Sequence, residues 1–249
     1  MRRAALALLL LAACSDQERT PLVVFAASSL TEAFGELEHA FEAAHPSVDL
    51  QPTFAGSQAL RLQIAHGAPA DVFASADLAH VAALVEAGSL EAPETFAHNE
   101  LALIVPDRPG AIERFEELDR AERIVVGAPS VPVGRYTERL LERAATTHGE
   151  PFAGAVRAAV ASEETNVRLV RAKVELGEAD AAFVYRTDVA GGSVRSVPIP
   201  EELRVRARYP IALVGLTEHR ADASAFVAFV RSPEGRAILE HHGFHTEAP

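Results

Sequence analysis

Short apolar runs alternate with amphipathic stretches along most of the chain. Leu22–Phe25 is an apolar run followed by small residues, a pattern typical of a buried strand. Val48–Phe54 alternates apolar and polar positions, which indicates a strand with one buried face. Runs of these two kinds predict further strands at 71–76, 101–105, 124–127, 181–185, 194–199 and 211–215.

Apolar residues at helical spacing fill the stretches between these strands. Leu30, Phe34 and Phe41 recur at intervals of three to four residues or their multiples, as on one face of a helix. Ser29–Glu32 has the serine and the glutamate of a capping box at the start of this helix. Similar patterns predict helices that begin near residues 57, 77, 135, 166, 221 and 233. The segment 156–161 fits a strand or a short helix equally well.

The alternation of strands and helices predicts an α/β fold with mostly parallel sheets. In such sheets a ligand binds outside the carboxyl ends of the strands, where the helices begin. Four segments have a small or hydroxyl-bearing residue at such a position: 26–30, 54–58, 131–135 and 165–168. The first turn of a helix exposes unpaired N–H groups and the positive end of the helix dipole. If the four segments converge, they form an anion site made of neutral donors.

The first 14 residues have the organisation of a bacterial lipoprotein signal. Arg2 and Arg3 precede an apolar run over 4–13. This run is shorter than the roughly 20 residues that a helix needs to cross a bilayer, so it fits a secretory signal. Leu11–Cys14 reads LAAC and resembles the lipobox, in which cleavage occurs before a cysteine that becomes lipidated.

This interpretation assigns 1–13 to a signal peptide and 14–20 to the lipidated Cys14 and a polar tether. The alternative is an ordinary cleaved signal with an incidental cysteine. We expect an exported protein on the periplasmic or cell-surface side of the membrane. Its lipid anchor at Cys14 would be its only contact with the membrane.

Composition and length limit both the partner and the fold of this chain. The chain has a net charge of −12, and loss of Arg2 and Arg3 with the signal would take it to −14, which makes nucleic acid an unsuitable partner. Cys14 is the single cysteine, so no disulfide framework exists and a large core must stabilise the fold. After removal of 1–13, 236 residues would remain, enough for one large domain or two lobes.

Six segments occur in the order expected for one family: FAASSLTEAF, FAGSQALRLQI, GAPADVFASAD, VPVGRY, EETNVRLV and AAFVYRTDV. On these motifs the chain resembles the molybdate-binding periplasmic components of ABC transporters. The resemblance implies a type II periplasmic-binding-protein fold, with two α/β lobes, a hinge and a ligand cleft between the lobes. It places lobe one at 21–104 plus 213–249 and lobe two at 107–210, with crossovers near 105–106 and 209–212.

The resemblance also implies a set of ligand contacts. Ser29 and Ser57 would each offer a hydroxyl and a backbone N–H from lobe one. Val133 and Val167 would each offer a backbone N–H from lobe two, and Tyr185 would donate its hydroxyl. The family usually has a smaller residue at position 133; valine is tolerable there because a backbone N–H makes the contact, and the sequence leaves open whether its side chain crowds the cleft.

Neutral donors of this kind favour an oxyanion that carries no proton, since no carboxylate is among the five contacts to accept one. Phosphate usually holds a proton at neutral pH, so it is expected to be a poorer ligand than an oxyanion that is fully deprotonated. The expected ligand is molybdate, with tungstate beside it, and the expected partner is an ABC permease. The alternative is another oxyanion or a small organic acid, such as sulfate or thiosulfate. The protein is expected to be a monomer and to need no cofactor.

An enzyme is the competing class of function. The chain lacks the G-x-S-x-G motif of a serine hydrolase, and no motif directs a histidine towards Ser28 or Ser29. His241, His242 and His245 lie near one another in sequence, but Gly243 interrupts any shared helical face. We therefore expect neither catalysis nor a metal-cation site, and interpret these histidines as solvated side chains.

Overall fold

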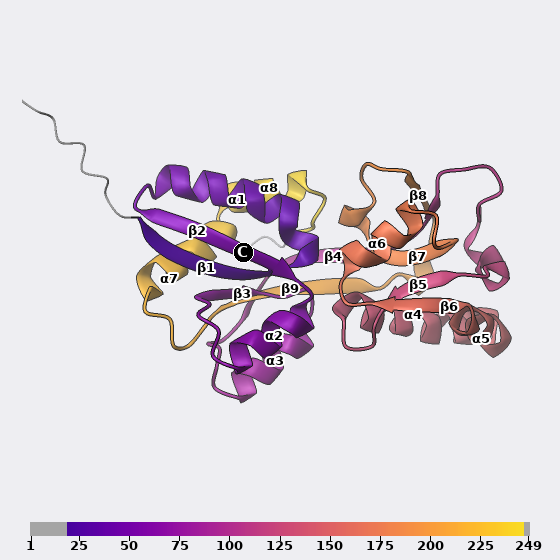
Figure 1. Ribbon diagram of the computed structural model, residues 1–249, viewed down its shortest axis with the longest axis horizontal. Coiled ribbons are helices and arrows are strands. Elements are labelled where there is room, and N and C mark those ends of the chain that lie inside the picture. Colours follow the sequence, from indigo (N-terminus) through magenta and orange to yellow (C-terminus); the bar gives the residue numbers. More distant parts are fainter. Residues whose placement is uncertain (1–18, 247–249) are drawn as a thin grey trace, which may run out of the picture.

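The computed structural model describes residues 19–246; the expected signal peptide, Cys14 and most of the tether lie outside them. Figure 1 shows two α/β lobes placed side by side along the long axis of the molecule. Lobe one contains β1–β3, α1–α3, α7 and α8, and lobe two contains β5–β8 and α4–α6. Within the described residues, no helix combines the length and the apolar character needed to cross a bilayer.

Lobe one is built on three parallel strands. The strand β1 (Thr20–Ala27) pairs with β2 (Val48–Ala55) on one side and β3 (Val72–Ala74) on the other. Leu22 and Val24 are fully buried, as expected for an apolar strand at the centre of a sheet. The helices of this lobe are α1 (Thr31–Ala44), α2 (Ser57–Ala65), α3 (Leu78–Glu86), α7 (Arg220–Val230) and α8 (Pro233–His241).

Two apolar layers hold these helices on opposite faces of the sheet. On one face α1 packs against α7, where the Phe226 ring lies 6.1 Å from Phe34 and 5.2 Å from Phe41, edge to face. On the other face, Leu60 of α2 and Val81 of α3 belong to a separate buried cluster. The C-terminal helices thus complete the lobe that the N-terminal strand begins (Figure 1).

Lobe two repeats this architecture with its own parallel strands. The strand β5 (Ile124–Gly127) pairs in parallel with β6 (Val160–Glu164) and with β7 (Ala181–Tyr185). The strand β8 (Val194–Val197) pairs with β4. The helices are α4 (Pro132–His148), α5 (Glu150–Ala158) and α6 (Val167–Glu175). Among the described residues of both lobes, short 3₁₀ helices form at η1 (Ser28–Leu30), η2 (Phe115–Arg120), η3 (Arg186–Asp188) and η4 (Glu201–Leu203).

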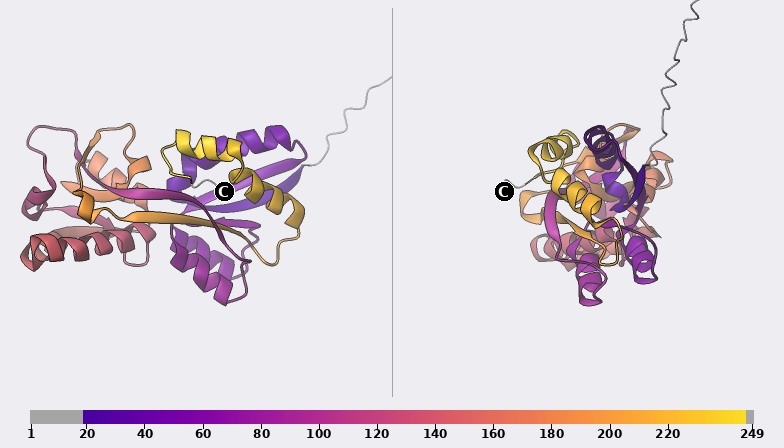
Figure 2. Two further views of the ribbon diagram at one scale, coloured as in Figure 1. Left: turned by 180° about the vertical axis from the view of Figure 1, so that it is seen from behind. Right: turned by 90° about the vertical axis from the view of Figure 1, so that its left-hand side faces the viewer.

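Two long strands connect the lobes. The strand β4 (Glu94–Pro106) pairs with β9 (Arg206–Leu213) over residues 94–100 and with β7 from Leu101 onward. The strand β9 pairs in turn with β3. Figure 2 shows both strands running across the back of the molecule from one lobe to the other. The pair forms a two-stranded connection at the base of the space between the lobes.

The structure confirms the α/β fold and corrects several details of the elements. The sheets are mixed, since β4 and β9 run antiparallel to their neighbours, whereas the alternation of elements predicted mostly parallel sheets. The ambiguous segment 156–161 contains the end of one element and the start of another, α5 and β6. The strand predicted at 101–105 is only the second part of β4, because the polar residues His98 and Asn99 interrupt the apolar pattern although both are buried.

Candidate functional site

A small pocket lies between the lobes, where four helices begin. Its volume in this arrangement is about 10 Å³, close to what a single water molecule needs, so the volume alone does not select a ligand. The structure brings together all five residues that were expected to contact a ligand: Ser29, Ser57, Val133, Val167 and Tyr185 line the pocket. The convergence of the four helix starts is therefore a feature of the fold.

Ser29 reaches the pocket from η1, the turn that precedes α1. Its Oγ lies 2.9 Å from the hydroxyl oxygen of Tyr209, and both residues are buried. The capping box predicted for Ser29–Glu32 is wrong, because α1 has Leu30 at its N-cap position and no side chain caps it. The first turn is instead fixed by the 3₁₀ conformation, which directs Ser29 towards the pocket and Tyr209.

Ser57 is the first residue of α2, and Gly56 is the N-cap. The backbone N–H of Ala76, which also lines the pocket, donates to Ser57 Oγ at 3.1 Å. No side chain caps α2, and the bond from Ala76 joins the segments that follow β2 and β3, the two strands on either side of β1. Because Ser57 Oγ accepts this bond, its hydroxyl proton stays available for another acceptor.

Val133 and Val167 lie in the first turns of the two helices that face these serines. Val133 follows Pro132, whose missing N–H is harmless at the start of α4. Val167 opens α6, where Asn166 caps the helix through a bond from the N–H of Leu169 at 3.1 Å. Both residues are buried, with exposures of 1% for Val133 and 3% for Val167.

Tyr185 ends β7 with its side chain between the lobes. Its exposure is 1%, and its hydroxyl has no hydrogen-bond partner among the described residues. Burial raises the pKa of the Tyr185 hydroxyl well above its usual value, so the group keeps its proton at neutral pH. A buried hydroxyl without a partner is costly, so the Tyr185 hydroxyl is an unused donor at the edge of this pocket.

No charged side chain among the described residues lines this pocket. An anion held here would therefore be bound by hydroxyls, amides and helix dipoles alone.

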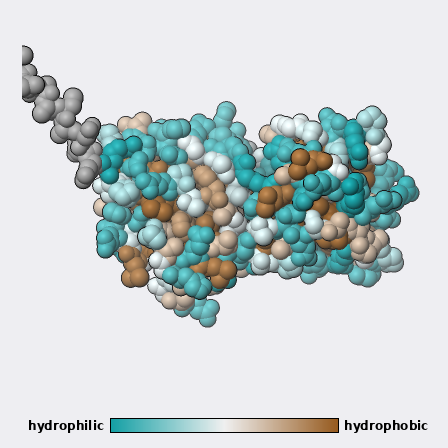
Figure 3. All heavy atoms as spheres, viewed as in Figure 1, coloured by the Kyte–Doolittle hydropathy of each residue, from teal (hydrophilic) through white to brown (hydrophobic). Residues whose placement is uncertain are grey.

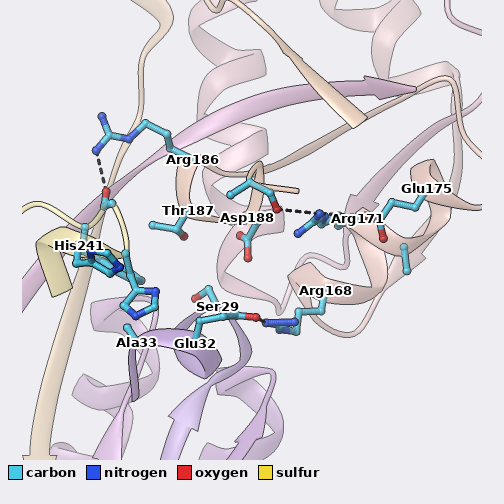
Figure 4. Close-up of a pocket in the computed structure, with 15 residues that line it drawn as sticks. Ser29, Glu32, Ala33, Arg168, Arg171, Glu175, Arg186, Thr187, Asp188 and His241 are labelled. Carbon is cyan, nitrogen blue, oxygen red and sulfur yellow. Dashed lines mark hydrogen bonds and ion pairs between the residues drawn. The ribbon is translucent and has the colours of Figure 1, made fainter. Parts of the chain in front are cut away.

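A larger cavity of about 670 Å³ adjoins the pocket at Ser29, and several charged side chains line it. Figure 4 shows Arg168, Arg171 and Asp188 facing this cavity from lobe two. Asp188 Oδ2 accepts the N–H of Tyr185 at 3.1 Å. Burial raises the pKa of Asp188 to about 7, against the opposing effect of that hydrogen bond and of Arg168.

Asp188 makes the stability of the fold depend on pH. Because its folded-state pKa lies above the usual value, the folded state binds more protons between about pH 4 and pH 7, and the free energy of unfolding falls as pH rises. Asp188→Asn keeps an acceptor for Tyr185 and removes the buried charge. Between pH 4.5 and pH 8, the free energy of unfolding of this variant, measured in urea, should rise by about 3 kcal/mol relative to that of the wild type. Asp107→Asn, at an exposed position, is the control. If the free energies of unfolding of Asp188→Asn and the wild type differ by the same amount at both pH values, the prediction is wrong.

Tyr209 is a site residue that the sequence did not indicate. It lies on β9, 180 residues after Ser29, and no local pattern connects the two positions. The alternation in β9 could have placed Tyr209 on the buried face with Ala207. It could not have identified Ser29 as its partner.

Two α/β lobes joined by two strands and closed over a small pocket form the architecture of a bilobed solute-binding protein. Residues 22–245 match the family model described as bacterial extracellular solute-binding protein. The chain belongs to this family.

Similar proteins agree with this assignment. The molybdate-binding protein ModA of Mycobacterium tuberculosis H37Rv is 40% identical over 228 residues, 90% of this chain and 84% of the relative. ModA of Escherichia coli K12 is 30% identical over 239 residues, 90% and 88% of the two chains. The periplasmic molybdate-binding protein of Azotobacter vinelandii has the same fold, with a TM-score of 0.78 and 20% identity over 91% of this chain and 100% of that one. These matches confirm the resemblance and the periplasmic-binding-protein fold indicated by the motifs.

Proposed function

We propose that this protein captures molybdate, and tungstate beside it, outside the cytoplasmic membrane and delivers it to an ABC permease. The observation that carries the proposal is the convergence of four helix starts and one unpaired tyrosine hydroxyl on a single small, uncharged pocket. The molybdate-binding relatives support the choice of ligand.

The proposed contacts are two serine hydroxyls, the Tyr185 hydroxyl and the backbone N–H groups of Val133 and Val167. Ser57 Oγ already accepts a bond from Ala76, and Ser29 Oγ can accept one from Tyr209. With its oxygen engaged in this way, each serine hydroxyl directs its own proton to the ligand. Together these donors replace the hydration shell that a dianion loses on burial.

The same chemistry favours an anion without a proton. A protonated oxyanion needs an acceptor in the site, and the pocket has no carboxylate among its described lining residues. Molybdate, tungstate and sulfate carry no proton at neutral pH, whereas phosphate usually carries one. We therefore rank phosphate below the other three.

Capture would use a hinge motion about β4 and β9, with the ligand bound by groups from both lobes. We propose that lobe one spans 21–104 plus 213–249 and lobe two 107–210. The protein would bind and release its ligand unchanged, without catalysis. Lipidation of Cys14 would hold it at the membrane. We propose that the protein acts as a monomer; the face shown in Figure 3 carries its apolar residues in small separate patches.

Thermal unfolding with a panel of anions tests the proposed ligand. The purified protein would be melted with molybdate, tungstate, sulfate or phosphate in turn. A ligand present at about 1,000 times its Kd adds roughly 4 kcal/mol to the free energy of unfolding, a readily measured shift in Tm. We expect large shifts with molybdate and tungstate and a small one with phosphate. A shift with sulfate as large as that with molybdate would favour a general oxyanion binder, and no shift with any anion would contradict the proposal.

A further inference from the structure

Three contacts cross from one lobe to the other around the rim of the pocket. None of the side chains that form them lines the pocket. In each contact, a residue in or next to the first turn of a helix in one lobe meets a residue at the same kind of position in the other lobe. We name these contacts the cross-lobe clamp: Arg135 with Asp77, Arg168 with Glu32, and Gln58 with Thr165.

Arg135 forms the most buried part of the clamp. Its guanidinium pairs with Asp77, whose side chain is 7% exposed, and its Nη2 lies 2.9 Å from His80 Nε2. His80 Nε2 also lies 2.9 Å from the carbonyl oxygen of Ser130, just before α4. Asp77 and His80 belong to α3 and its cap, whereas Arg135 and Ser130 belong to lobe two. This contact exists only when the lobes are together.

Arg168 forms the second part from the first turn of α6. It pairs with Glu32 of α1, as Figure 4 shows, and its Nε donates to the carbonyl oxygen of Ser28 at 3.1 Å. Ser28 precedes Ser29 in η1, so a residue of lobe two fixes the turn that presents Ser29. The side chains of Arg168 and Glu32 are 41% and 60% exposed, which makes this ion pair the weaker of the two.

Gln58 closes the third side of the rim. Its Nε2 donates to the carbonyl oxygen of Thr165 at 2.7 Å. At the neighbouring Gly56, an added Cβ would lie 2.3 Å from the same oxygen, so the two backbones approach closely here. Only glycine permits this approach.

We propose that the cross-lobe clamp sets the rate at which a bound oxyanion is released, through residues that do not touch it. This inference rests on the proposed function, since it concerns the ligand of that pocket. A contact made only in the closed arrangement stabilises that arrangement, and the lobes must separate before the ligand leaves. The donors in the pocket determine which anion is bound, and the clamp determines how long it stays.

Release of radiolabelled molybdate into excess unlabelled molybdate tests the clamp. Arg135→Gln should speed release about tenfold, because it leaves the buried Asp77 without its cation. Arg168→Gln should speed release about threefold. Arg157→Gln is the matched control, because Arg157 pairs with Glu138 at 2.6 Å inside lobe two, and its release rate should stay within twofold of the wild type.

A double-mutant cycle separates the ion pair from general damage to the fold. If Glu32 and Arg168 act as a pair, the effect of Glu32→Gln on release should largely disappear when Arg168→Gln is already present. Asp77 is left intact because it also caps α3 by accepting the N–H of His80. Full additivity in the cycle, or release at the wild-type rate in both arginine variants, would overturn the proposal.

The failure of the clamp and the failure of the proposed function give different results. A wild-type protein that binds molybdate, with variants that release it at an unchanged rate, contradicts the clamp alone. A wild-type protein that binds neither molybdate nor sulfate contradicts the proposed function. In that event small-angle X-ray scattering of the free proteins decides the clamp: we expect a larger radius of gyration for the Arg135→Gln, Arg168→Gln double variant, and an equal radius would overturn it.

Discussion

Replacement of both Ser29 and Ser57 by alanine is expected to weaken molybdate binding about a thousandfold. Each hydroxyl would donate to a dianion in a buried pocket, and a hydrogen bond to a charged group contributes about 1.5–3 kcal/mol. Two such bonds account for a loss of this size. Isothermal titration calorimetry of the wild type and the double variant measures it.

The control must separate the loss of donors from the loss of packing. Ser75 is fully buried beside the site, and its Oγ accepts the N–H of Asp77 at 3.2 Å, but it does not line the pocket. Ser75→Ala should lower the Tm while leaving the Kd within about twofold of the wild type. A Ser29→Ala, Ser57→Ala protein that is folded and binds molybdate with full affinity would refute the proposed site.

Tyr185→Phe is expected to change binding and stability in opposite directions. Its hydroxyl is buried without a partner among the described residues, so its removal relieves a cost of about 1–3 kcal/mol in the free protein. The same change removes one donor to the ligand and should raise the Kd about thirtyfold. Thermal unfolding of the free protein and calorimetry with molybdate measure the two effects.

Tyr209→Phe is the matched control for this variant. Tyr209 is also fully buried, but its hydroxyl lies 2.9 Å from Ser29 Oγ. Its loss should lower the Tm of the free protein, because the Ser29 hydroxyl then loses its partner. If Tyr185→Phe binds molybdate as tightly as the wild type, Tyr185 does not donate to the ligand.

Local patterns predicted the elements that position the site. The apolar run at Leu22–Phe25 and the small residues after it fix the end of β1, and α3 begins directly after Asp77, as predicted. Strand lengths were predicted less well: β4 crosses between the lobes with buried polar residues, and a local hydrophobic pattern does not distinguish such residues from a loop. The helix α5 was missed except for its end, because its short apolar segment fits either type of element.

The candidate site was predicted through the family motifs, and its detailed chemistry was not. Ser29 fits an N-cap by spacing, yet the 3₁₀ turn η1 moves it out of that role and towards Tyr209. The motifs assigned no role to Gln58, and the structure shows that it reaches Thr165 in the other lobe. Such contacts join residues more than a hundred positions apart, so they depend on how the lobes pack.

A crystal structure of the protein with molybdate, phased by anomalous scattering at the molybdenum edge, tests the central claim most directly. We expect one anomalous peak in the pocket between the lobes, with hydrogen bonds from Ser29, Ser57, Val133, Val167 and Tyr185 and no charged side chain in contact. A peak held by Arg168 and Arg171 in the neighbouring cavity, or no peak at saturating molybdate, would contradict an account based on neutral donors.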